Sequence, residues 1–503
     1  MKNKSMASSL LLLGALCFGS CSSTKKLYTT SCTFPEGSSI EEKVRLSAHV
    51  VPSQRQLNWQ KMEYTAFICY GINTFTDKEW GTGKEDPKQF NPTNLDAGQW
   101  VSTAKEAGMK MILLTCKHHD GFCLWPSKET DFSVESSPWK EGKGDLVREV
   151  SDACRKEGLK FAVYLSPWDM NHPTYGTEAY NDVFTNQLTE LLTQYGQVDE
   201  VWFDGACGEG PNGKKQVYDF KRYYETIRKL QPQAVIAVMG PDVRWVGTES
   251  GYGRDTEWSV IPAAEASLKE IANSSQQEAG TGTFLPTGGN MKKDMGSRLL
   301  LEKANGVIWY PSEVDVSIRP GWYYHAKEDV KVKTPQKLID IYYSSVGKNS
   351  LLLLNIPPDK RGLIHENDKH SLLEMKRILQ NTFAHNYVDK KYKKLTDNRL
   401  DTYWQGSAKN KVIEIALEGE QKIDRLLLQE NITQGQRIEE FMLECWTGSE
   451  WRTVATGTTV GFKRILRFDS VTCNKVRITI LKSRDVPQLA EVGLYKSSEE
   501  EKM

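Results

Sequence analysis

Val201-Trp202-Phe203-Asp204-Gly205-Ala206 is an apolar run that stops abruptly at a carboxylate and a glycine. Strands of a parallel sheet are buried on both faces and therefore read as continuous apolar runs. In a (β/α)8 barrel the chemistry lies where such strands end, at the carboxyl face of the sheet. Asp204 is thus a candidate catalytic residue, although its position fits equally well an aspartate that caps the following turn.

The same pattern repeats on both sides of this run. Between about residues 60 and 360, apolar runs alternate with amphipathic helical patterns, and repeated β-then-α units indicate a parallel sheet. Such repetition over about 300 residues predicts an α/β fold, a (β/α)8-type TIM barrel over residues 46–372. We expect strands at 65–71, 110–117, 160–167, 200–205, 234–240, 306–311 and 350–357, one more strand in the Gly-rich stretch 274–295, and helices at 96–107, 145–156, 180–195, 216–230, 261–273 and 335–347.

The C-terminal part has a different pattern, because no helix-length repeat interrupts its strand-like runs after residue 380. Regularly spaced short strands with turn residues between them are typical of a β-sandwich. We therefore expect an all-β sandwich over residues 380–498, with strands at 411–417, 423–430, 439–446, 450–455, 464–468 and 475–481.

The N-terminus has the features of an export signal. Lys2 and Lys4 precede an apolar stretch at 10–18, and Gly19-Ser20 stand directly before Cys21. This order predicts a lipoprotein signal peptide over 1–20, lipidation of Cys21 and a tether over 21–45, in the cell envelope of a Gram-negative-type bacterium, at the periplasm or the cell surface. An ordinary secretory signal with an incidental cysteine is the alternative. The apolar stretch is too short to span a bilayer, so we expect membrane contact only through the lipid.

The amino-acid composition indicates which classes of binding partner the protein can have. Lys+Arg and Asp+Glu are equal at 65 each, so no net positive field attracts nucleic acid. The 14 Trp and 20 Tyr residues suit a carbohydrate binder, because sugar rings stack on aromatic rings, and they suit a large apolar core nearly as well. The ten cysteines lack C-x-x-C pairs and zinc-ligand spacing, so we expect neither a metal nor another cofactor.

Polar residues gather where the expected barrel strands end. They include Glu79-Trp80, His118-His119, Tyr164, Asp204 and, farther along, Arg244 and Trp322. A rim of carboxylates, imidazoles and tryptophans suits glycoside hydrolysis, which needs two carboxyl groups and partners for sugar hydroxyls. The adjacent histidines could also bind a metal, but neighbouring side chains at a strand end point to opposite faces. Contact with sugar hydroxyls is therefore the favoured role.

The barrel resembles the glycoside hydrolase family of retaining α-L-fucosidases (family 29 type), in its branch that acts on α1-3- or α1-4-linked fucose. The segments that carry the resemblance follow the family order: 73–81 (Asn-Thr-Phe-Thr-Asp-Lys-Glu-Trp-Gly), 117–122 (Lys-His-His-Asp-Gly-Phe), 164–169 (Tyr-Leu-Ser-Pro-Trp-Asp), 200–205 (Glu-Val-Trp-Phe-Asp-Gly), 240–247 (Gly-Pro-Asp-Val-Arg-Trp-Val-Gly) and 316–322 (Val-Ser-Ile-Arg-Pro-Gly-Trp). The C-terminal part is similar to the discoidin-type sandwich, in which 395–397 (Leu-Thr-Asp) and 401–404 (Asp-Thr-Tyr-Trp) form the opening signature.

The resemblance implies roles for individual residues. It makes Asp204 the nucleophile and Glu249 the acid/base, whereas the residues alone leave Asp242, Glu249 and Glu257 level. It implies two-step displacement, with the two carboxyl groups about 5–5.5 Å apart and the pKa of Glu249 raised. The implied fucose pocket comprises Glu79, Trp80, His118, His119, Tyr164, Arg244 and Trp322, and the further candidates are Cys69, Asp169, Asp242 and Trp258.

Two positions depart from the family pattern. The family usually carries a histidine that helps to bind fucose at the place of Cys69, and a thiol is a poorer hydrogen-bond partner. Losing such a contact costs about 1–3 kcal/mol. The second departure is 254–258, Arg-Asp-Thr-Glu-Trp, where relatives have Glu-Thr-Asn-Trp.

Three hypotheses follow from these observations. The first is an exported exo-α-L-fucosidase acting on α1-3/1-4-linked fucose in Lewis-type or other branched glycans. The second is a fucosylated-glycan-binding lipoprotein with weak or lost hydrolase activity, which Cys69 and the sandwich favour. The third is a hydrolase for another sugar of similar shape, such as galactose. The sandwich itself either contacts glycan a second time, through Tyr403, Trp404 and Trp446, or only supports the barrel.

Overall fold

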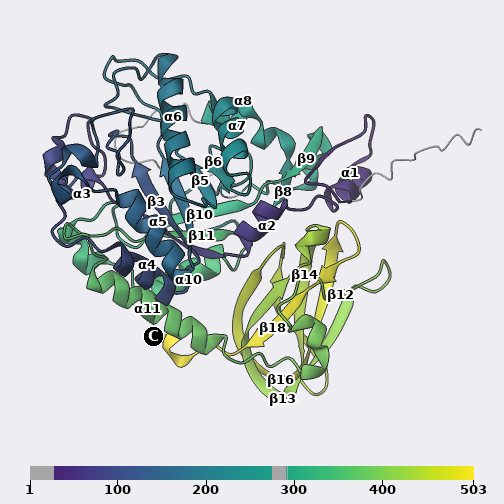
Figure 1. The fold of residues 1–503 in the computed structure, drawn as a ribbon. Coiled ribbons are helices and arrows are strands. Elements are labelled where there is room, and N and C mark those ends of the chain that lie inside the picture. The colour runs from purple at the N-terminus through teal and green to yellow at the C-terminus, as the bar shows by residue number, and fades with distance from the viewer. Residues whose placement is uncertain (1–27, 275–290, 292, 503) are drawn as a thin grey trace, which may run out of the picture.

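The computed structural model describes residues 28–274, 291 and 293–502 (Figure 1). The expected signal peptide and Cys21 lie outside these residues. The described part of the expected tether is folded: it contains β1 (Ser31–Thr33), which pairs with β9, and most of α1 (Ile40–Ser47). Phe34 and Val44 hold this segment down, because both are buried in one apolar cluster with Val307 and Trp309. Among the described helices, none has the length and apolar character of a membrane span.

The barrel prediction is confirmed. An eight-stranded sheet runs in the order β6-β5-β4-β3-β2-β11-β10-β7, and every ladder in it is parallel. A parallel bridge between Ala237 and Val243 brings its two edges together, so the barrel is nearly closed. The strands are β2 (Tyr64–Ile68), β3 (Met111–Lys117), β4 (Lys160–Leu165), β5 (Glu200–Phe203), β6 (Val235–Val238), β7 (Arg244–Trp245), β10 (Ser312–Ser317) and β11 (Leu351–Asn355).

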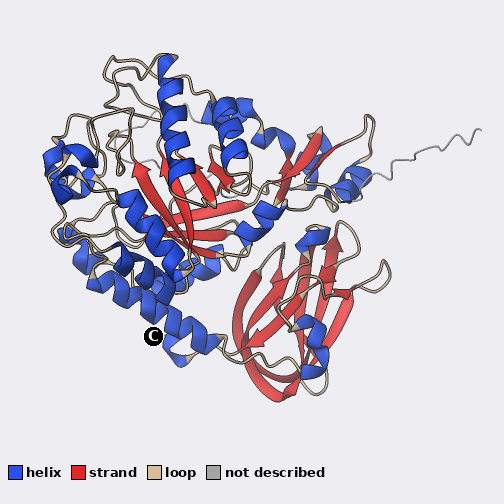
Figure 2. Ribbon diagram, viewed as in Figure 1, coloured by secondary structure: helices blue, strands red, loops and turns tan. Residues whose placement is uncertain are grey.

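Helices cover the outside of this sheet (Figure 2). Most begin at a side-chain cap: Asp96, Asp145, Asp219 and Thr334 each accept a hydrogen bond from the backbone three residues on. The helices are α2 (Gln54–Gln60), α3 (Ile72–Thr76), α4 (Ala97–Glu106), α5 (Leu146–Glu157), α6 (Ala179–Gln194), α7 (Phe220–Leu230), α8 (Leu268–Ser274), α9 (Arg298–Lys303), α10 (Pro335–Ser345) and α11 (Glu366–Thr382). Short 3-10 turns are η1 (Pro87–Gln89), η2 (Val134–Ser136), η3 (Trp139–Gly142), η4 (Ala263–Ala266), η5 (Ala326–Lys331), η6 (Lys390–Leu395), η7 (Ile432–Gln434) and η8 (Glu499–Lys502).

One barrel strand was misplaced by the sequence reading. The apolar run at 306–311 forms β9 (Gly306–Trp309), which pairs antiparallel with β1 and β8 (Val260–Pro262) in a separate sheet. The barrel uses the next segment, β10, which contains Glu313 and Asp315. A search for apolar runs misses β10, because its buried carboxylates are satisfied by indole N–H groups that lie far away in the sequence. Most of the Gly-rich stretch expected to hold a strand lies outside the described residues.

The C-terminal prediction is also confirmed: the chain ends in an antiparallel β-sandwich. Its larger sheet has the order β15-β14-β16-β13-β18, and β12 pairs with β17. Two expected pairs of short strands merge into β13 and β16, whose ladder continues across register shifts. The strands are β12 (Trp404–Gln405), β13 (Val412–Gln429), β14 (Ile438–Trp446), β15 (Trp451–Gly457), β16 (Arg464–Ser483), β17 (Gln488–Leu489) and β18 (Glu491–Tyr495). Figure 1 shows α11 leading from the barrel into this domain.

Candidate active site

Asp204 follows β5 directly, at the carboxyl end of the barrel. One carboxylate oxygen accepts the Tyr164 hydroxyl at 2.9 Å, and the other accepts the backbone N–H of Ala206 at 2.7 Å. Burial, and then the charge of Asp204, raise the pKa of Tyr164, so the phenol stays protonated and donates. The Asp204 side chain is nevertheless 25% exposed. It is therefore both held in orientation and open to a ligand.

Glu249 lies on the segment that follows β7, and its Oε2 accepts the indole N–H of Trp322 at 3.2 Å. The residue as a whole is exposed, but its carboxyl end lies among the groups of the site. Burial, and then the charges of Asp204 and Glu79, raise the pKa of Glu249 to about 7. A carboxyl group that keeps its proton near neutral pH beside a second carboxylate is what a general acid requires.

The structure separates Glu249 from the two carboxylates that sequence reasoning left level with it. Asp242 accepts hydrogen bonds from Arg55 at 3.1 Å and from the backbone N–H of Ile236 at 2.8 Å, and it forms an ion pair with Arg228. Glu257 is buried and forms ion pairs with Arg244 and Arg254. Both serve the packing of the chain, and Glu249 is the one coupled electrostatically to Asp204.

Glu79 connects the first barrel strand to the Trp322 loop. It accepts the backbone N–H groups of Trp322 at 2.7 Å and Tyr323 at 3.3 Å, and it bonds His325 Nε2 at 2.7 Å. The other ring nitrogen of His325 bonds Asp77 at 2.6 Å. Burial opposes protonation of His325, but the hydrogen bonds to Asp77 and Glu79 outweigh it and raise its pKa. Glu79 thus fixes Trp322, and with it the hydrogen bond to Glu249.

The two adjacent histidines lie side by side, with ring centroids 4.0 Å apart. The argument that they face opposite ways was therefore wrong, because both lie in the turn beyond β3 rather than in the strand. Ser166 donates to the Trp168 carbonyl at 2.8 Å, so His119 Nδ1, at 2.7 Å from Ser166 Oγ, is the donor of that pair. His119 Nε2 is then an acceptor, 3.9 Å from Asp204 Oδ2.

Both imidazoles are neutral. Burial, and then Lys117, lower the pKa of His119 to about 3, and burial with its neighbour His119 lowers the pKa of His118 well below the usual range. The described residues contain no group of three or more His, Cys, Asp or Glu side chains arranged to hold a metal ion. As neutral groups, the rings can exchange hydrogen bonds with sugar hydroxyls without competing for the charge of Asp204.

Aromatic side chains surround these polar groups. Tyr164 stacks on Trp202 with ring centroids 5.2 Å apart. Trp80 is 38% exposed and stands edge-on to His119 and Trp168. Sequence reasoning missed Trp202 and Trp168, although both belong to the strand-end segments that it quoted. The combination of apolar ring faces and clustered hydrogen-bonding groups suits a deoxysugar, which has a methyl group as well as hydroxyls.

Cys69 lies next to this cluster, directly after β2. Its backbone N–H donates to Asn355 at 3.0 Å, and its thiol accepts from the Thr115 hydroxyl at 3.6 Å. Burial raises the pKa of the thiol well above its usual value, and the charges of Glu79, Asp204 and Glu249 add to that effect. The thiol is therefore a neutral, weakly polar group near the carboxylates of Glu79, Asp204 and Glu249.

Several expected site residues are engaged elsewhere. Arg244 is buried, and its guanidinium bonds Glu257 and the backbone carbonyls of Tyr310 and Trp258; its contact with the sugar stays a prediction. Asp169 forms a buried ion pair with Lys117 at 3.1 Å. Trp258 packs under the guanidinium of Arg484, 3.3 Å from the ring centroid. Asp242, as described above, ties down the end of β6.

The aromatic residues proposed for a second sugar contact are also occupied. Trp404 packs against the core of the sandwich, and Tyr403 accepts a hydrogen bond from Gln434 at 3.0 Å. Lys475 lies over the ring of Trp446 at 4.4 Å from its centroid.

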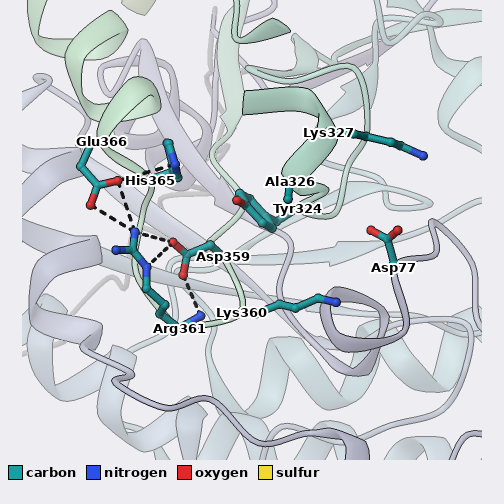
Figure 3. A pocket seen from close by; sticks show the side chains of 9 residues that line it. All are labelled: Asp77, Tyr324, Ala326, Lys327, Asp359, Lys360, Arg361, His365 and Glu366. Carbon is teal, nitrogen blue, oxygen red and sulfur yellow. Dashed lines mark hydrogen bonds and ion pairs between the residues drawn. The ribbon is translucent and has the colours of Figure 1, made fainter. Parts of the chain in front are cut away.

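A cavity of about 460 Å³ adjoins the Glu79 loop (Figure 3). Asp77, the partner of His325, lies on one side of it, and the bonded group Asp359, Arg361 and Glu366 lies on the other. Two hydrogen bonds through His325 connect this cavity to Glu79. Its lining is Asp77, Tyr324, Ala326, Lys327, Asp359, Lys360, Arg361, His365 and Glu366. Sequence reasoning did not find it, because its residues come from three separate loops.

Comparison with known proteins agrees with this geometry. The family model described as Alpha-L-fucosidase matches residues 41–382, and the F5/8 type C domain model matches residues 380–492. The chain belongs to the α-L-fucosidase family. It is 42% identical to Alpha-L-fucosidase 1 of Arabidopsis thaliana over 468 residues, which cover 88% of this chain and 87% of that protein.

Solved structures lead to the same family. A crystal structure from Bacteroides ovatus is 52% identical with a TM-score of 0.85, over 94% of this chain and 79% of the other. A Ruminococcus gnavus fucosidase of glycoside hydrolase family 29, solved in complex with fucose, is 30% identical with a TM-score of 0.76, over 90% and 96% of the two chains. This chain is an α-L-fucosidase, a glycoside hydrolase with a discoidin-like C-terminal domain.

Proposed function

We propose that this α-L-fucosidase is a retaining exo-enzyme that releases α1-3- and α1-4-linked fucose from Lewis-type and other branched glycans. The observation that carries the mechanism is the pair of Asp204 and Glu249. Asp204 is oriented by Tyr164 and the Ala206 amide and stays open to a ligand. Glu249 has a pKa raised to about 7 by burial and by its carboxylate neighbours.

In the proposed first step, an Asp204 oxygen attacks the anomeric carbon of fucose while Glu249 donates its proton to the leaving oxygen. In the second step, Glu249 takes a proton from water, and the water oxygen displaces Asp204 from the sugar. We expect the two carboxyl groups to lie about 5–5.5 Å apart with substrate bound. His119 Nε2 would accept a hydrogen bond from a sugar hydroxyl, and Trp80 and Trp322 would pack against the sugar ring.

The mechanism is tested by the stereochemistry of the product. Proton NMR during the first minutes of hydrolysis should show α-L-fucose accumulating before it equilibrates with the β anomer. Initial release of β-L-fucose would instead indicate single displacement and would remove Asp204 from the role of nucleophile.

The linkage preference rests on two observations. The motifs that follow the barrel strands resemble the α1-3/1-4 branch, and the cavity beside Asp77 offers charged groups for the hydroxyls of a branched leaving group close to Glu79. We expect faster release from Lewis a and Lewis x trisaccharides than from α1-2- or α1-6-linked fucosides at equal concentration. Equal or faster release from the α1-2 or α1-6 compounds would reject the preference. The alternative of a glycan-binding protein without activity finds no support beside the paired carboxylates.

We also propose that the enzyme is exported and anchored through a lipid on Cys21, on the basis of the residues around that cysteine. In cells, the wild type should then sediment with membranes and carry a diacylglyceryl group detectable by mass spectrometry. The Cys21→Ala variant should lose the modification and appear in the soluble fraction. An unmodified Cys21 in the exported protein would overturn this proposal.

A further inference from the structure

The acid/base candidate stands on an irregular segment between two different sheets. Residues 246–259 contain neither helix nor strand. The segment begins at β7, which belongs to the barrel, and ends at β8, which pairs with β9 outside it. Since β7 is only two residues long, its hydrogen bonds to the neighbouring strand fix the position of this segment only weakly.

Arg244 connects the two ends of this segment. It is the first residue of β7, and its guanidinium reaches across to Glu257 and to the Trp258 carbonyl at 3.2 Å. It also donates to the Tyr310 carbonyl at 3.1 Å. The two ends of the segment are thereby joined, and Glu249 lies in the part between them. The arginine that sequence reasoning assigned to the sugar thus holds the loop of the acid/base.

The C-terminal sandwich forms hydrogen bonds with the end of the segment that Arg244 contacts. Thr459 Oγ1 accepts the backbone N–H of Glu257 at 2.9 Å. Gln436 accepts the backbone N–H of Ser259 at 2.8 Å and donates to the Glu257 carbonyl at 3.0 Å. Both side chains are buried, and both come from the C-terminal domain. The Glu257 carboxylate therefore pairs with Arg244, and the backbone N–H and C=O of Glu257 both form hydrogen bonds with the sandwich.

The sandwich also forms hydrogen bonds with Asp255, closer to the middle of the segment. The Asp255 carbonyl accepts the Thr458 hydroxyl at 2.8 Å and Arg464 Nη1 at 2.7 Å. The barrel supplies further anchors: the Val246 amide donates to the Glu313 carbonyl at 2.9 Å, the Gly253 amide donates to the Ser344 carbonyl at 2.7 Å, and Asn349 Nδ2 donates to the Glu257 carbonyl at 3.2 Å. Buried backbone groups need their partners, because water no longer reaches them. In the final part of the segment, the sandwich supplies the acceptors for the Glu257 and Ser259 amides, and it shares the Glu257 carbonyl with Asn349 of the barrel.

We propose that the C-terminal sandwich is a working part of the active site, which holds Glu249 in position through a clasp of Arg244, Glu257, Gln436 and Thr459. These four are positioning residues: they touch no substrate and act through the loop that carries the acid/base. The inference rests on the proposed role of Glu249. A displacement of about 1 Å at a reacting group can cost about 100-fold in rate, so a loosened clasp should appear in catalysis before it appears in folding.

The test uses the leaving group, because protonation by a general acid matters only when the leaving oxygen is basic. The double variant Thr459→Val, Gln436→Met removes the sandwich's three hydrogen bonds to Glu257 and Ser259 at nearly constant volume. We expect kcat/KM on a Lewis a trisaccharide, which reports the first step and not the hydrolysis of the fucosyl-enzyme, to fall about 10- to 100-fold. On 2-chloro-4-nitrophenyl α-L-fucoside, whose leaving group needs no proton, kcat/KM should stay within about threefold.

Matched variants separate this effect from general damage. Thr459→Ser keeps the accepting hydroxyl and should behave as the wild type. Asp340→Asn breaks another contact between the domains, the exposed Arg467–Asp340 pair, and should change neither substrate. Thr459→Val alone, a smaller change, should show the same selectivity for the trisaccharide if the double variant folds poorly, as judged by circular dichroism.

Two results would overturn the proposal: equal losses on both substrates, or no loss on either. Glu249→Gln, measured beside these variants, distinguishes failure of the clasp from failure of the proposed function. If Glu249→Gln discriminates between the two substrates and the clasp variants do not, the inference fails and the acid/base role stands. If Glu249→Gln lowers kcat/KM equally on both substrates, the acid/base role itself fails.

Discussion

The barrel holds two sets of acidic side chains, one at its carboxyl rim and one in its interior. The rim set is Asp204 and Glu249, and the interior set is Glu200, Glu313 and Asp315. Each interior carboxyl group receives an indole N–H at 2.7 Å, from Trp59, Trp202 and Trp245 respectively. Glu249 receives Trp322 in the same way. The chemical environment is thus similar in both sets.

Burial raises the pKa of all four indole-bonded carboxyl groups. The charge of Glu200 adds to the effect of burial and raises the pKa of Glu313 further. The two sets differ in access: the interior groups are buried, whereas Asp204 is partly exposed. A perturbed pKa in this barrel therefore marks a catalytic carboxyl only where a ligand can reach it.

The largest effect should come from removing Asp204, the rim carboxylate that we propose as the nucleophile. Asp204→Ala should lower kcat by roughly 10⁴-fold or more, because no other group can form the covalent intermediate. Sodium azide should partly restore turnover of an aryl fucoside by taking the vacant place and giving a fucosyl azide of inverted configuration. If Asp204→Ala kept an activity near that of the wild type, the proposed catalytic role of the rim carboxylates would be rejected.

The second prediction concerns the rim acid. Glu249→Gln should lower kcat on a trisaccharide by about 10²- to 10⁴-fold. The wild type needs Glu249 protonated before attack, so its activity should fall as pH rises through the pKa of about 7. The variant should lack that alkaline limb when rates are measured from pH 5 to 9. A limb unchanged in the variant would assign it to another group.

The third prediction moves to the interior set, where stability should change and catalysis should not. Burial raises the pKa of Glu200 to about 7, so its protonated form stabilises the fold at low pH. That contribution is complete below the unfolded value of about 4.5 and is lost as pH rises toward 7.

Glu200→Gln should therefore match the wild type near pH 4.5 and be more stable by up to about 3 kcal/mol at pH 8. Urea unfolding at the two pH values, beside kcat on an aryl fucoside, measures both effects. A large loss of kcat with intact folding would give the interior carboxyl a part in catalysis.

The smallest effect should come from Cys69, which lies between the two sets. Its thiol is a weak hydrogen-bond partner and stays neutral because burial raises its pKa. Cys69→Ala should lower kcat/KM by less than about threefold. Cys69→Ser, which replaces the thiol with a stronger hydrogen-bonding group, is the matched control. A loss above tenfold in the alanine variant would show that the thiol contacts the sugar.

Local patterns were enough for the parts of the fold that bury continuous apolar runs. The run before Asp204 becomes β5, and the helices expected to begin at residues 96 and 145 do begin there, with Asp96 and Asp145 as their N-caps. The strand at 312–317 escaped prediction, because Glu313 and Asp315 make it look polar. Only the indoles of Trp202 and Trp245, brought in by the closed barrel, make that segment suitable for burial.

By itself, the sequence determined the barrel, the sandwich and the rim position of Asp204, because these follow from periodicity and from motifs read along the chain. The resemblance to the family already singled out Glu249 among Asp242, Glu249 and Glu257, but only the tertiary structure shows which of these carboxylates pair with arginines, and only the tertiary structure places Arg244 at the base of a loop. The physical reason is that a charged side chain takes its role from the partners around it. Arg55 and Arg228 neutralise Asp242, and Arg244 neutralises Glu257. Burial and the neighbouring carboxylates of Asp204 and Glu79 raise the pKa of Glu249 to about 7, against the opposing effect of the Trp322 indole N–H, and so Glu249 keeps its proton below that pH.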